Sequence, residues 1–418
     1  PPWRLSGPGA ILLVHAYSMF VYFYLFTRAG LARLDSAFLE AAQSLGAGRG
    51  RILRRVTIPL LGPALAGAAL LTFMTSLSSF SAPYLFGGTF RVMTTQIVFS
   101  RLNGDTEMAM VETVTLAALA LAGLYLLLRT ESRREISGAI RGAAPARVRL
   151  RRGVLVAAAG WILAALLLLP HATLILISFV PAGTWSSQIF PPVLNGSNWI
   201  TVFSQAEHLR PIVNSLWMAA VATGAALALG FAAAYLAVGR RKPWARTLET
   251  LITLPWALPG TVFAVALAAA FSRNAPWAGR FILVGTAAIL PLAYLARNLP
   301  LTGRAAFAGL RQLDPSLEEA AASLGAGRGR RLWRVTVPLI APALAAGAAL
   351  AFLTAFGDFV VSVVLYTFDT RPISIEILSS LRMQETGVAA AYGVLLAGLS
   401  AVAFLLSSRF SERTGASG

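Results

Sequence analysis

Cysteine is absent from this 418-residue sequence, and histidine is scarce. Without cysteine, the chain can hold no disulfide framework, no zinc finger and no thiolate-bound iron–sulfur cluster. The three histidines, His15, His171 and His208, are far apart in the chain. We therefore expect no metal site built from side chains, and no cofactor.

Charge is also scarce, because 12% of the residues are charged and 57% are hydrophobic. Soluble domains usually carry about 25% charged residues. The 35 basic and 17 acidic residues give a formal net charge of +18, a balance that also occurs in nucleic-acid-binding proteins. Long apolar runs separate the basic clusters here, which favours the positive-inside pattern of a membrane protein. We expect a lipid bilayer and no nucleic acid as partner.

Long apolar runs are abundant. A helix needs about 20 predominantly apolar residues to cross the hydrocarbon core, and it satisfies its own backbone hydrogen bonds there. The sequence therefore predicts an all-α membrane protein. Nine stretches qualify: 9–27, 60–82, 109–128, 153–180, 212–238, 248–271, 281–299, 339–365 and 389–408.

The basic residues predict the orientation of these helices. If the connections with the most arginine share one side, that side holds 27 of the basic residues and the other side holds 8. The richer side is cytoplasmic by the positive-inside rule, and it includes the C-terminal tail. The segment 129–152 has eight arginines and is expected to be a basic cytoplasmic linker.

One segment occurs twice. Asp35–Leu65 and Asp314–Leu344 align without a gap at an offset of 279 residues, with 21 of 31 positions identical. The chain is therefore expected to be a tandem repeat, with a first half at 1–128 and a second half at 153–418. Because both copies fall on the cytoplasmic side, the repeat is parallel and not inverted.

The two halves differ in length. Six predicted helices belong to the second half and about three to the first. Residue 1 is Pro, and if the halves were once equal, roughly 130 residues are missing before it. We expect the first half to be truncated.

The repeated segments, 35–59 and 314–338, carry strong helix boundary signals. Asp35 and Asp314 suit the N-cap position, and Pro315 suits the first helical position. Gly46 and Gly325 suit a left-handed position just beyond the helix end. Each copy is expected to form a helix–turn–helix outside the membrane, ending near the proline that opens the next membrane helix.

The repeated segments resemble the signature loop of binding-protein-dependent ABC importer permeases. The first copy has Glu-Ala-Ala at 40–42, Gly46 and Val-Thr-Ile-Pro at 56–59, and the second has Glu-Ala-Ala at 319–321, Gly325 and Val-Thr-Val-Pro at 335–338. Family members often have Ile and Leu at the two aliphatic positions. The resemblance implies that each loop docks on an ATPase subunit. The residues assigned to this coupling are Glu40, Ala41, Ala42, Gly46, Glu319, Ala320, Ala321 and Gly325. Taken alone, the two glutamates could be ordinary exposed helix charges.

The chain itself carries no nucleotide-binding motif. The glycines of 46–50 follow no strand, and a P-loop needs Gly-Lys-Ser/Thr, whereas the single lysine is Lys242 before Pro243. We therefore expect no catalytic residues and no enzyme activity. The resemblance implies two copies of a separate ABC ATPase, an extracytoplasmic substrate-binding protein and a place in the inner membrane.

Asp358 is the candidate for the substrate pathway, since ionisable residues within apolar stretches are expensive and often functional. The alternative is an interfacial acid near water. Its counterpart in the first copy is Ser79, so the two halves differ there.

The solute is the least constrained feature. The fused layout and the segments 80–88 and 91–95 resemble ferric-iron permeases, which makes ferric iron the first candidate. Fused thiamine or phosphonate permeases and polyamine permeases are the alternatives. An ion-driven secondary transporter also uses repeats and broken helices, and a nucleic-acid- or lipid-binding protein could use the basic linker.

Overall fold

The computed structural model describes residues 5–32, 34–132, 153–185, 188–239 and 243–415, and these residues contain helices and no β-strand. They divide into two compact units, Pro1–Leu168 and Leu169–Gly418. The division falls within one helix, α9 (Gly153–Ser178). Most of the predicted basic linker, 133–152, lies outside the described residues, while 129–132 belong to the helix before it.

Unit 1 contains three long helices, joined by short ones. Its elements before α9 are α1 (Pro8–Ala32), α2 (Ser36–Ser44), α3 (Arg49–Ile52), the π-helix η1 (Leu53–Thr57), α4 (Ile58–Leu60), α5 (Gly62–Leu77), α6 (Ser81–Phe86), α7 (Met93–Leu102) and α8 (Thr106–Ser132).

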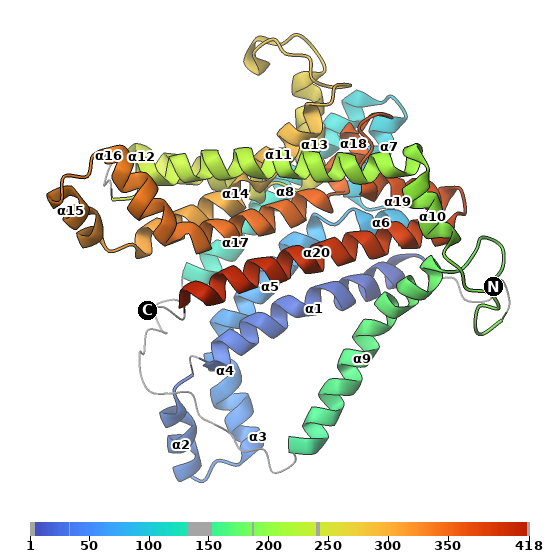
Figure 1. The fold of residues 1–418 in the computed structure, drawn as a ribbon. Coiled ribbons are helices and arrows are strands. Elements are labelled where there is room, and N and C mark those ends of the chain that lie inside the picture. The colour runs from blue at the N-terminus through green and yellow to red at the C-terminus, as the bar shows by residue number, and fades with distance from the viewer. Residues whose placement is uncertain (1–4, 33, 133–152, 186–187, 240–242, 416–418) are drawn as a thin grey trace. The chain divides into compact units, whose positions relative to one another are not determined.

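Unit 2 is a larger bundle. Its elements after α9 are α10 (Ser197–Ser204), α11 (Ala206–Ala237), α12 (Pro243–Thr253), the 3₁₀-helix η3 (Leu254–Ala257), α13 (Gly260–Phe271), the 3₁₀-helix η4 (Pro276–Ala278), α14 (Ile289–Gln312), α15 (Pro315–Ser323), α16 (Arg328–Arg331), the π-helix η5 (Leu332–Thr336), α17 (Val337–Phe356), α18 (Val360–Leu365), α19 (Ile373–Arg382) and α20 (Thr386–Gly415). Within this unit, α11, α14, α17 and α20 run side by side, with α15 and α16 at one end and α10 and α19 at the other (Figure 1). The end that carries α10 and α19 is called the far end of unit 2.

The two units share a series of elements. At an offset of 279 residues, the bounds of α2, α3, η1 and α6 coincide with those of α15, α16, η5 and α18. After a one-residue slip, the bounds of α7 coincide with those of α19. Equivalent positions in the two units can therefore be compared directly.

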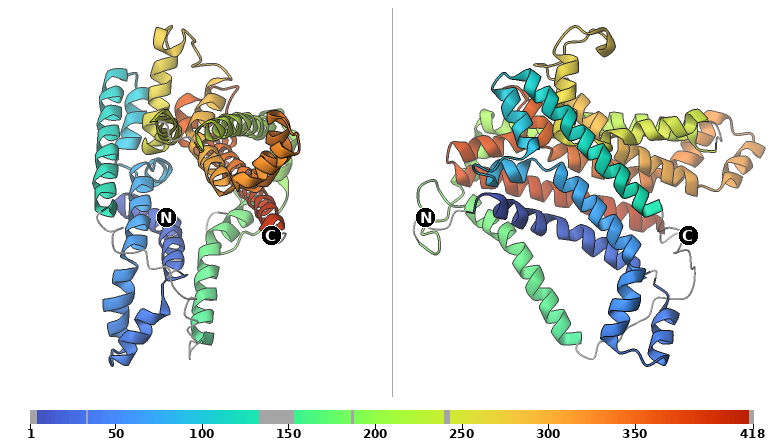
Figure 2. Two further views of the ribbon diagram at one scale, coloured as in Figure 1. Left: turned by 90° about the vertical axis from the view of Figure 1, so that its left-hand side faces the viewer. Right: turned by 180° about the vertical axis from the view of Figure 1, so that it is seen from behind.

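Three of the predicted spans are wrong in detail. The stretch 248–271 is broken, because the helices on either side of Pro259 meet at 104° and α13 runs across the direction of α11 (Figure 2). Ala264 and Ala268 of α13 are buried in the core of unit 2. The stretch 281–299 holds a loop, and its helix begins at Ile289 and continues to Gln312. The stretch 339–365 ends as a helix at Phe356, and α18 follows as a separate short helix.

Six described helices are long and apolar enough to cross a membrane, and eight if each of two bent pairs counts as one span. The α14 helix is not among them, because it carries Arg297, Asn298, Arg304 and Arg311. The chain is thus a multi-pass membrane protein whose helix leading into the second repeated segment is unusually polar.

Small residues hold α14 tightly against α11. A Cβ added to Gly230 would lie 2.8 Å from the backbone nitrogen of Gly303, so the backbones meet there. Thr302 Oγ1 donates a 2.7 Å hydrogen bond to the carbonyl of Ala226. Close approach through small residues and inter-helix hydrogen bonds is the usual way membrane helices associate. The packing fixes the helix that presents the second repeated segment.

Candidate functional site: two exposed helical loops

The first helix of each repeated segment begins with an aspartate cap. Asp35 accepts a 2.9 Å hydrogen bond from the amide of Ala37, and Asp314 accepts one of 2.9 Å from the amide of Ser316. These caps satisfy amides that have no partner within the helix. The bond from Ser316 holds the pKa of Asp314 below its usual range, since it favours the ionised carboxylate. The predicted N-caps are confirmed.

The same helices end in a Schellman motif. Gly46 and Gly325 have φ of +74° and +81°, the left-handed conformation predicted for them. The amide of Gly46 donates to Gln43 at 2.9 Å, and that of Ala47 donates to Ala42 at 3.0 Å. In the second copy, Gly325 donates to Ala322 at 2.9 Å and Ala326 donates to Ala321 at 3.0 Å. The pattern closes the last turn and reverses the chain.

The eight residues predicted to couple lie together on these short helices, four in each copy. Glu40 and Ala41 are exposed, as are Glu319 and Ala320, whereas Ala42 and Ala321 are half-buried. Because alanine has a short side chain, a partner can approach the helix closely beside the glutamate. Which residues touch a partner remains a prediction.

Sequence reasoning missed one feature of this surface. Leu45 and Leu324, the residues just before the two glycines, are 88% and 89% exposed. Leucines this exposed at equivalent positions form an apolar tip on each loop. Their signal was present in the repeat, since both copies keep Leu before Gly where a solvated turn would favour a polar residue.

Each loop connects to its membrane helix through a π-helix. We expected a separate second helix ending near Pro59 or Pro338, but α16, η5 and α17 form one continuous helix over Arg328–Phe356. In the first copy the helix bends by 62° between Arg49–Leu60 and Gly62–Leu77. Single-turn π segments are frequent at functional positions in helices. The second loop is thus joined to its membrane helix without a break.

The second loop has an internal tie that the first lacks. Thr336 Oγ1 donates a 2.5 Å hydrogen bond to Glu318, which connects α15 to η5. The position equivalent to Glu318 in the first copy is Leu39, which cannot accept a hydrogen bond. The two loops therefore share their shape and differ in how firmly they are held.

Asp358 lies in the break between α17 and α18, at the end of α17 opposite the loop of its own unit. Its carboxylate accepts hydrogen bonds from the amides of Val361 at 2.9 Å and Ser362 at 3.1 Å, and its side chain is 8% exposed. Arg297 lies 4.0 Å away, and Tyr294 bonds Ser362 at 2.6 Å. Asp358 thus caps α18. Its assignment to a substrate pathway remains a prediction.

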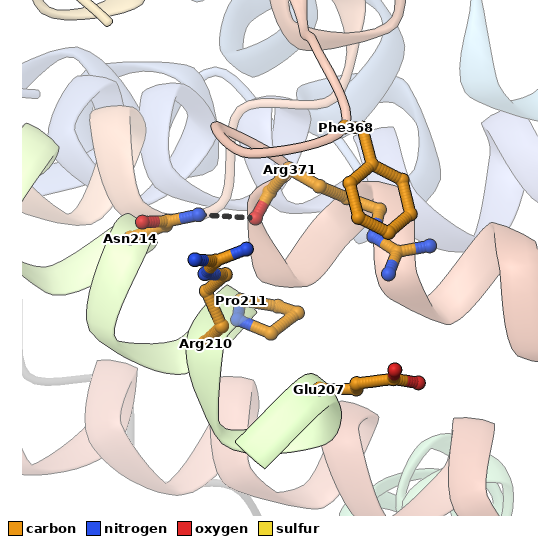
Figure 3. Close-up of a pocket in the computed structure, with 6 residues that line it drawn as sticks. All are labelled: Glu207, Arg210, Pro211, Asn214, Phe368 and Arg371. Carbon is orange, nitrogen blue, oxygen red and sulfur yellow. Dashed lines mark hydrogen bonds between the residues drawn. The ribbon is translucent and has the colours of Figure 1, made fainter.

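A small pocket opens at the far end of unit 2, remote from the loop at its other end. Glu207, Arg210, Pro211, Asn214, Phe368 and Arg371 line it (Figure 3). Its volume is about 20 Å³, enough for one water molecule and too small for a larger solute. A wider cavity of about 410 Å³ shares Phe368 and Arg371 with it.

A membrane bundle with an exposed helical hairpin at equivalent positions of two units is the arrangement expected of a transport permease. The chain belongs to the family described as binding-protein-dependent transport system inner membrane component, whose profile matches residues 3–130 and 226–415. The family is one of transport subunits and not of enzymes.

Curated relatives agree with this assignment. The chain is 32% identical to a probable ABC transporter permease, y4fN, of Sinorhizobium fredii, over 98% of this chain and 73% of that one. It is 30% identical to the ferric transport system permease protein FbpB of Actinobacillus pleuropneumoniae, over 94% of this chain and 57% of that one. It is 32% identical to the sulfate transport system permease protein CysT of Escherichia coli, over 44% and 71%. The chain thus spans little more than half of the ferric relative.

The fold is also that of a solved transporter. A bacterial ABC transporter that imports the acidic polysaccharide alginate matches 63% of this chain and 96% of its own, with a TM-score of 0.51 and 20% identity. Among the described residues, no group of three or more His, Cys, Asp or Glu could hold a metal ion.

Proposed function

We propose that this chain passes a solute from an extracytoplasmic binding protein to the cytoplasm, with ATP hydrolysed on two separate ABC ATPase subunits. The two exposed loops carry this proposal. Each is capped at both ends, each presents Glu-Ala-Ala beside an apolar tip, and each leads into a membrane helix. Family membership supports the kinds of partner.

Each loop is proposed to dock one ATPase subunit. Glu40 and Glu319 would pair with basic groups of the ATPase, while Ala41, Ala42, Ala320 and Ala321 leave room for its surface. Gly46 and Gly325 set the turn. Closure of the ATPase pair would then move α5 and α17, and the direct helical connection in the second copy favours this transmission.

The arginine distribution supports the orientation. Both loops and the C-terminal end of α20 would lie on the cytoplasmic side of the inner membrane, and the far end of unit 2 would lie on the extracytoplasmic side. Asp358, at the end of α17 opposite the loop, would then lie toward the extracytoplasmic side.

Ferric iron is the proposed solute. The similarity to the ferric transport permease extends over 94% of this chain, whereas that to the Escherichia coli sulfate permease extends over 44%. Sulfate is the second candidate because that partial similarity has a comparable identity of 32%. Thiamine, phosphonate and polyamines are further alternatives.

Uptake by a reconstituted complex tests the solute. The chain, its ATPase and its binding protein would be placed in vesicles, and ATP-dependent accumulation of radiolabelled ferric iron, sulfate, thiamine and a polyamine would be compared. We expect accumulation of ferric iron alone. Accumulation of sulfate without iron would overturn the choice of solute and keep the permease assignment, whereas ATP-independent uptake driven by an ion gradient would overturn the permease assignment.

A further inference from the structure

A network of polar side chains crosses the far end of unit 2. Arg371 Nε lies 2.9 Å from Glu376 Oε2, and the Glu376 side chain is 6% exposed. His208 Nδ1 lies 3.6 Å from the same carboxylate, and the hydroxyl of Tyr392 donates a 2.6 Å hydrogen bond to the carbonyl of His208. The buried carboxylate of Glu376 therefore links the loop before α19 with α11. The hydrogen bond from Tyr392 to His208 then links α11 with α20.

A second network occupies the equivalent place in unit 1. Arg91 Nη1 donates to Gln96 Oε1 at 3.3 Å, and Gln96 Nε2 donates to Ser100 at 3.3 Å. Ser100 in turn donates to Glu112 Oε2 at 2.9 Å. This chain of hydrogen bonds links the loop before α7 with α8.

The two networks carry their carboxylate at different, non-equivalent positions. At the offset of 280 residues that relates α7 to α19, Arg91 corresponds to Arg371 and Ser100 to Ser380. Gln96 corresponds to Glu376, and Glu112 corresponds to Tyr392. Each network thus keeps one arginine and one carboxylate, with the acid on the short helix in unit 2 and on the long helix in unit 1.

The unpaired hydroxyl of Ser380 in unit 2 agrees with this exchange of the carboxylate between helices. Ser380 Oγ is buried and has no hydrogen-bond partner among the described residues, whereas its counterpart Ser100 bonds both Gln96 and Glu112. By analogy with Ser100 and Glu112, a glutamate at position 392 would offer the Ser380 hydroxyl the hydrogen-bond acceptor that it lacks.

Backbone contacts tie the same region further. Asn214 Nδ2 donates to the carbonyls of Asp369 at 2.8 Å and Arg371 at 3.1 Å, and Ser215 accepts from the amide of Ile373 at 2.8 Å. These bonds fasten the segment before α19 to α11, which is 32 residues long and ends near the loop-bearing side of unit 2.

We propose that Arg371 and Glu376 are positioning residues that form an ion-pair clasp at the far end of unit 2, and that the hydrogen-bonded chain from Arg91 through Gln96 and Ser100 to Glu112 is its counterpart in unit 1. The clasp keeps the far ends of the long helices together, so that motion delivered at a coupling loop moves the unit as one body. The mechanical role rests on the proposed function, while the existence of the clasp does not.

Breaking one partner of a buried ion pair is costly because it leaves the other charge without compensation. Glu376→Gln removes the carboxylate that pairs with Arg371. Adding Tyr392→Glu to that variant rebuilds the arrangement of unit 1, with Gln and Glu at the two positions and Ser380 available between them. If the clasp is real, the second substitution rescues the first.

The absence of cysteine provides a clean reporter. Ala391, beside Tyr392 on α20, is fully buried, so Ala391→Cys adds a single thiol that reacts with a water-soluble maleimide only when the far end opens. Labelling of the purified chain needs neither ATPase nor solute. Glu107→Gln, at an exposed glutamate of α8 that belongs to neither network, is the control.

In the reporter background, we expect Glu376→Gln to raise the labelling rate at least about tenfold, because it leaves the charge of Arg371 without its ionic partner. The double substitution should return it to within about threefold of the parent. Labelling unchanged by Glu376→Gln, or equally fast in the double variant, would overturn the clasp.

If the double variant does not fold, a cycle of Arg371→Gln, Glu376→Gln and both together decides the question. The summed effects of the two single substitutions on the labelling rate should exceed the effect of the double substitution. If the effects simply add, ion-pair coupling between Arg371 and Glu376 is overturned. In vesicles, Glu376→Gln should lower the solute imported per ATP while ATPase association stays intact. Unchanged transport per ATP in a variant that labels quickly would overturn the mechanical role alone.

Discussion

Thr336 donates a hydrogen bond to Glu318, and this bond ties the exposed α15 to the π-helix that leads into α17. Thr336 is fully buried, so its hydroxyl has few alternatives to this partner. Thr336→Val should lower the free energy of unfolding by about 1 kcal/mol and raise amide exchange in α15. Hydrogen exchange followed by mass spectrometry measures the second effect. Thr57→Val is the control, since Leu39 stands where Glu318 would be. Equal protection of α15 in Thr336→Val and the parent would contradict the tie.

The left-handed glycines give a prediction with a control inside the same loop. Gly325→Ala should cost about 1 to 2 kcal/mol, because its φ of +81° is unfavourable for any residue with a Cβ. No atom lies within 4 Å of the position a Cβ would take, so the cost comes from the backbone alone. Gly327→Ala, with φ of −64° and open space in the same loop, should cost less. Thermal unfolding of the two variants checks the difference, and a neutral Gly325→Ala would contradict the assigned conformation.

The Asp314 cap predicts a local dependence on pH. Its pKa is lowered in the folded loop, so its contribution to stability is present above the ordinary aspartate range and is lost as pH falls through the lowered pKa. The amide of Ser316 should therefore exchange faster, relative to the intrinsic rate, as pH drops below about 4. In Asp314→Asn, which caps without a charge, protection should not vary with pH. A parent as insensitive to pH as the asparagine variant would show that the carboxylate does not cap the helix.

The apolar tips should matter for docking and not for folding. Leu45 and Leu324 are almost fully exposed, so Leu45→Ser with Leu324→Ser removes little that is buried in the free chain. If the tips enter an apolar part of the ATPase surface, the pair should weaken ATPase binding at least tenfold, since burying a leucine is worth about 1.5 to 3 kcal/mol. Binding measured by surface plasmon resonance would decide this. Unchanged affinity would remove the tips from the interface.

Local signals were predictable from the sequence, and long-range ones were not. Asp35, Asp314, Gly46 and Gly325 act within a few residues of their own position, and each has the predicted role. The all-helical membrane fold follows from the apolar runs.

The break at Asp358 was missed because 339–365 is apolar almost throughout, and only the capping geometry shows where the helix ends. The pairing of His208 with Glu376 joins residues far apart in the chain, which no single sequence reveals. The repeat keeps Leu45 and Leu324 at equivalent positions, but the extent of their exposure is seen only in the structure, since leucine favours burial.

The central claim is that two ATPase subunits dock on the two loops through Glu40 and Glu319. Co-purification of the ATPase with Glu40→Arg plus Glu319→Arg tests it most directly, beside a Glu107→Arg control at an exposed glutamate of α8 outside the loops. We expect the control to retain the parental amount of ATPase and either single reversal to retain less. The double reversal should retain little or none. A double variant that binds the ATPase and imports solute like the parent would contradict the account.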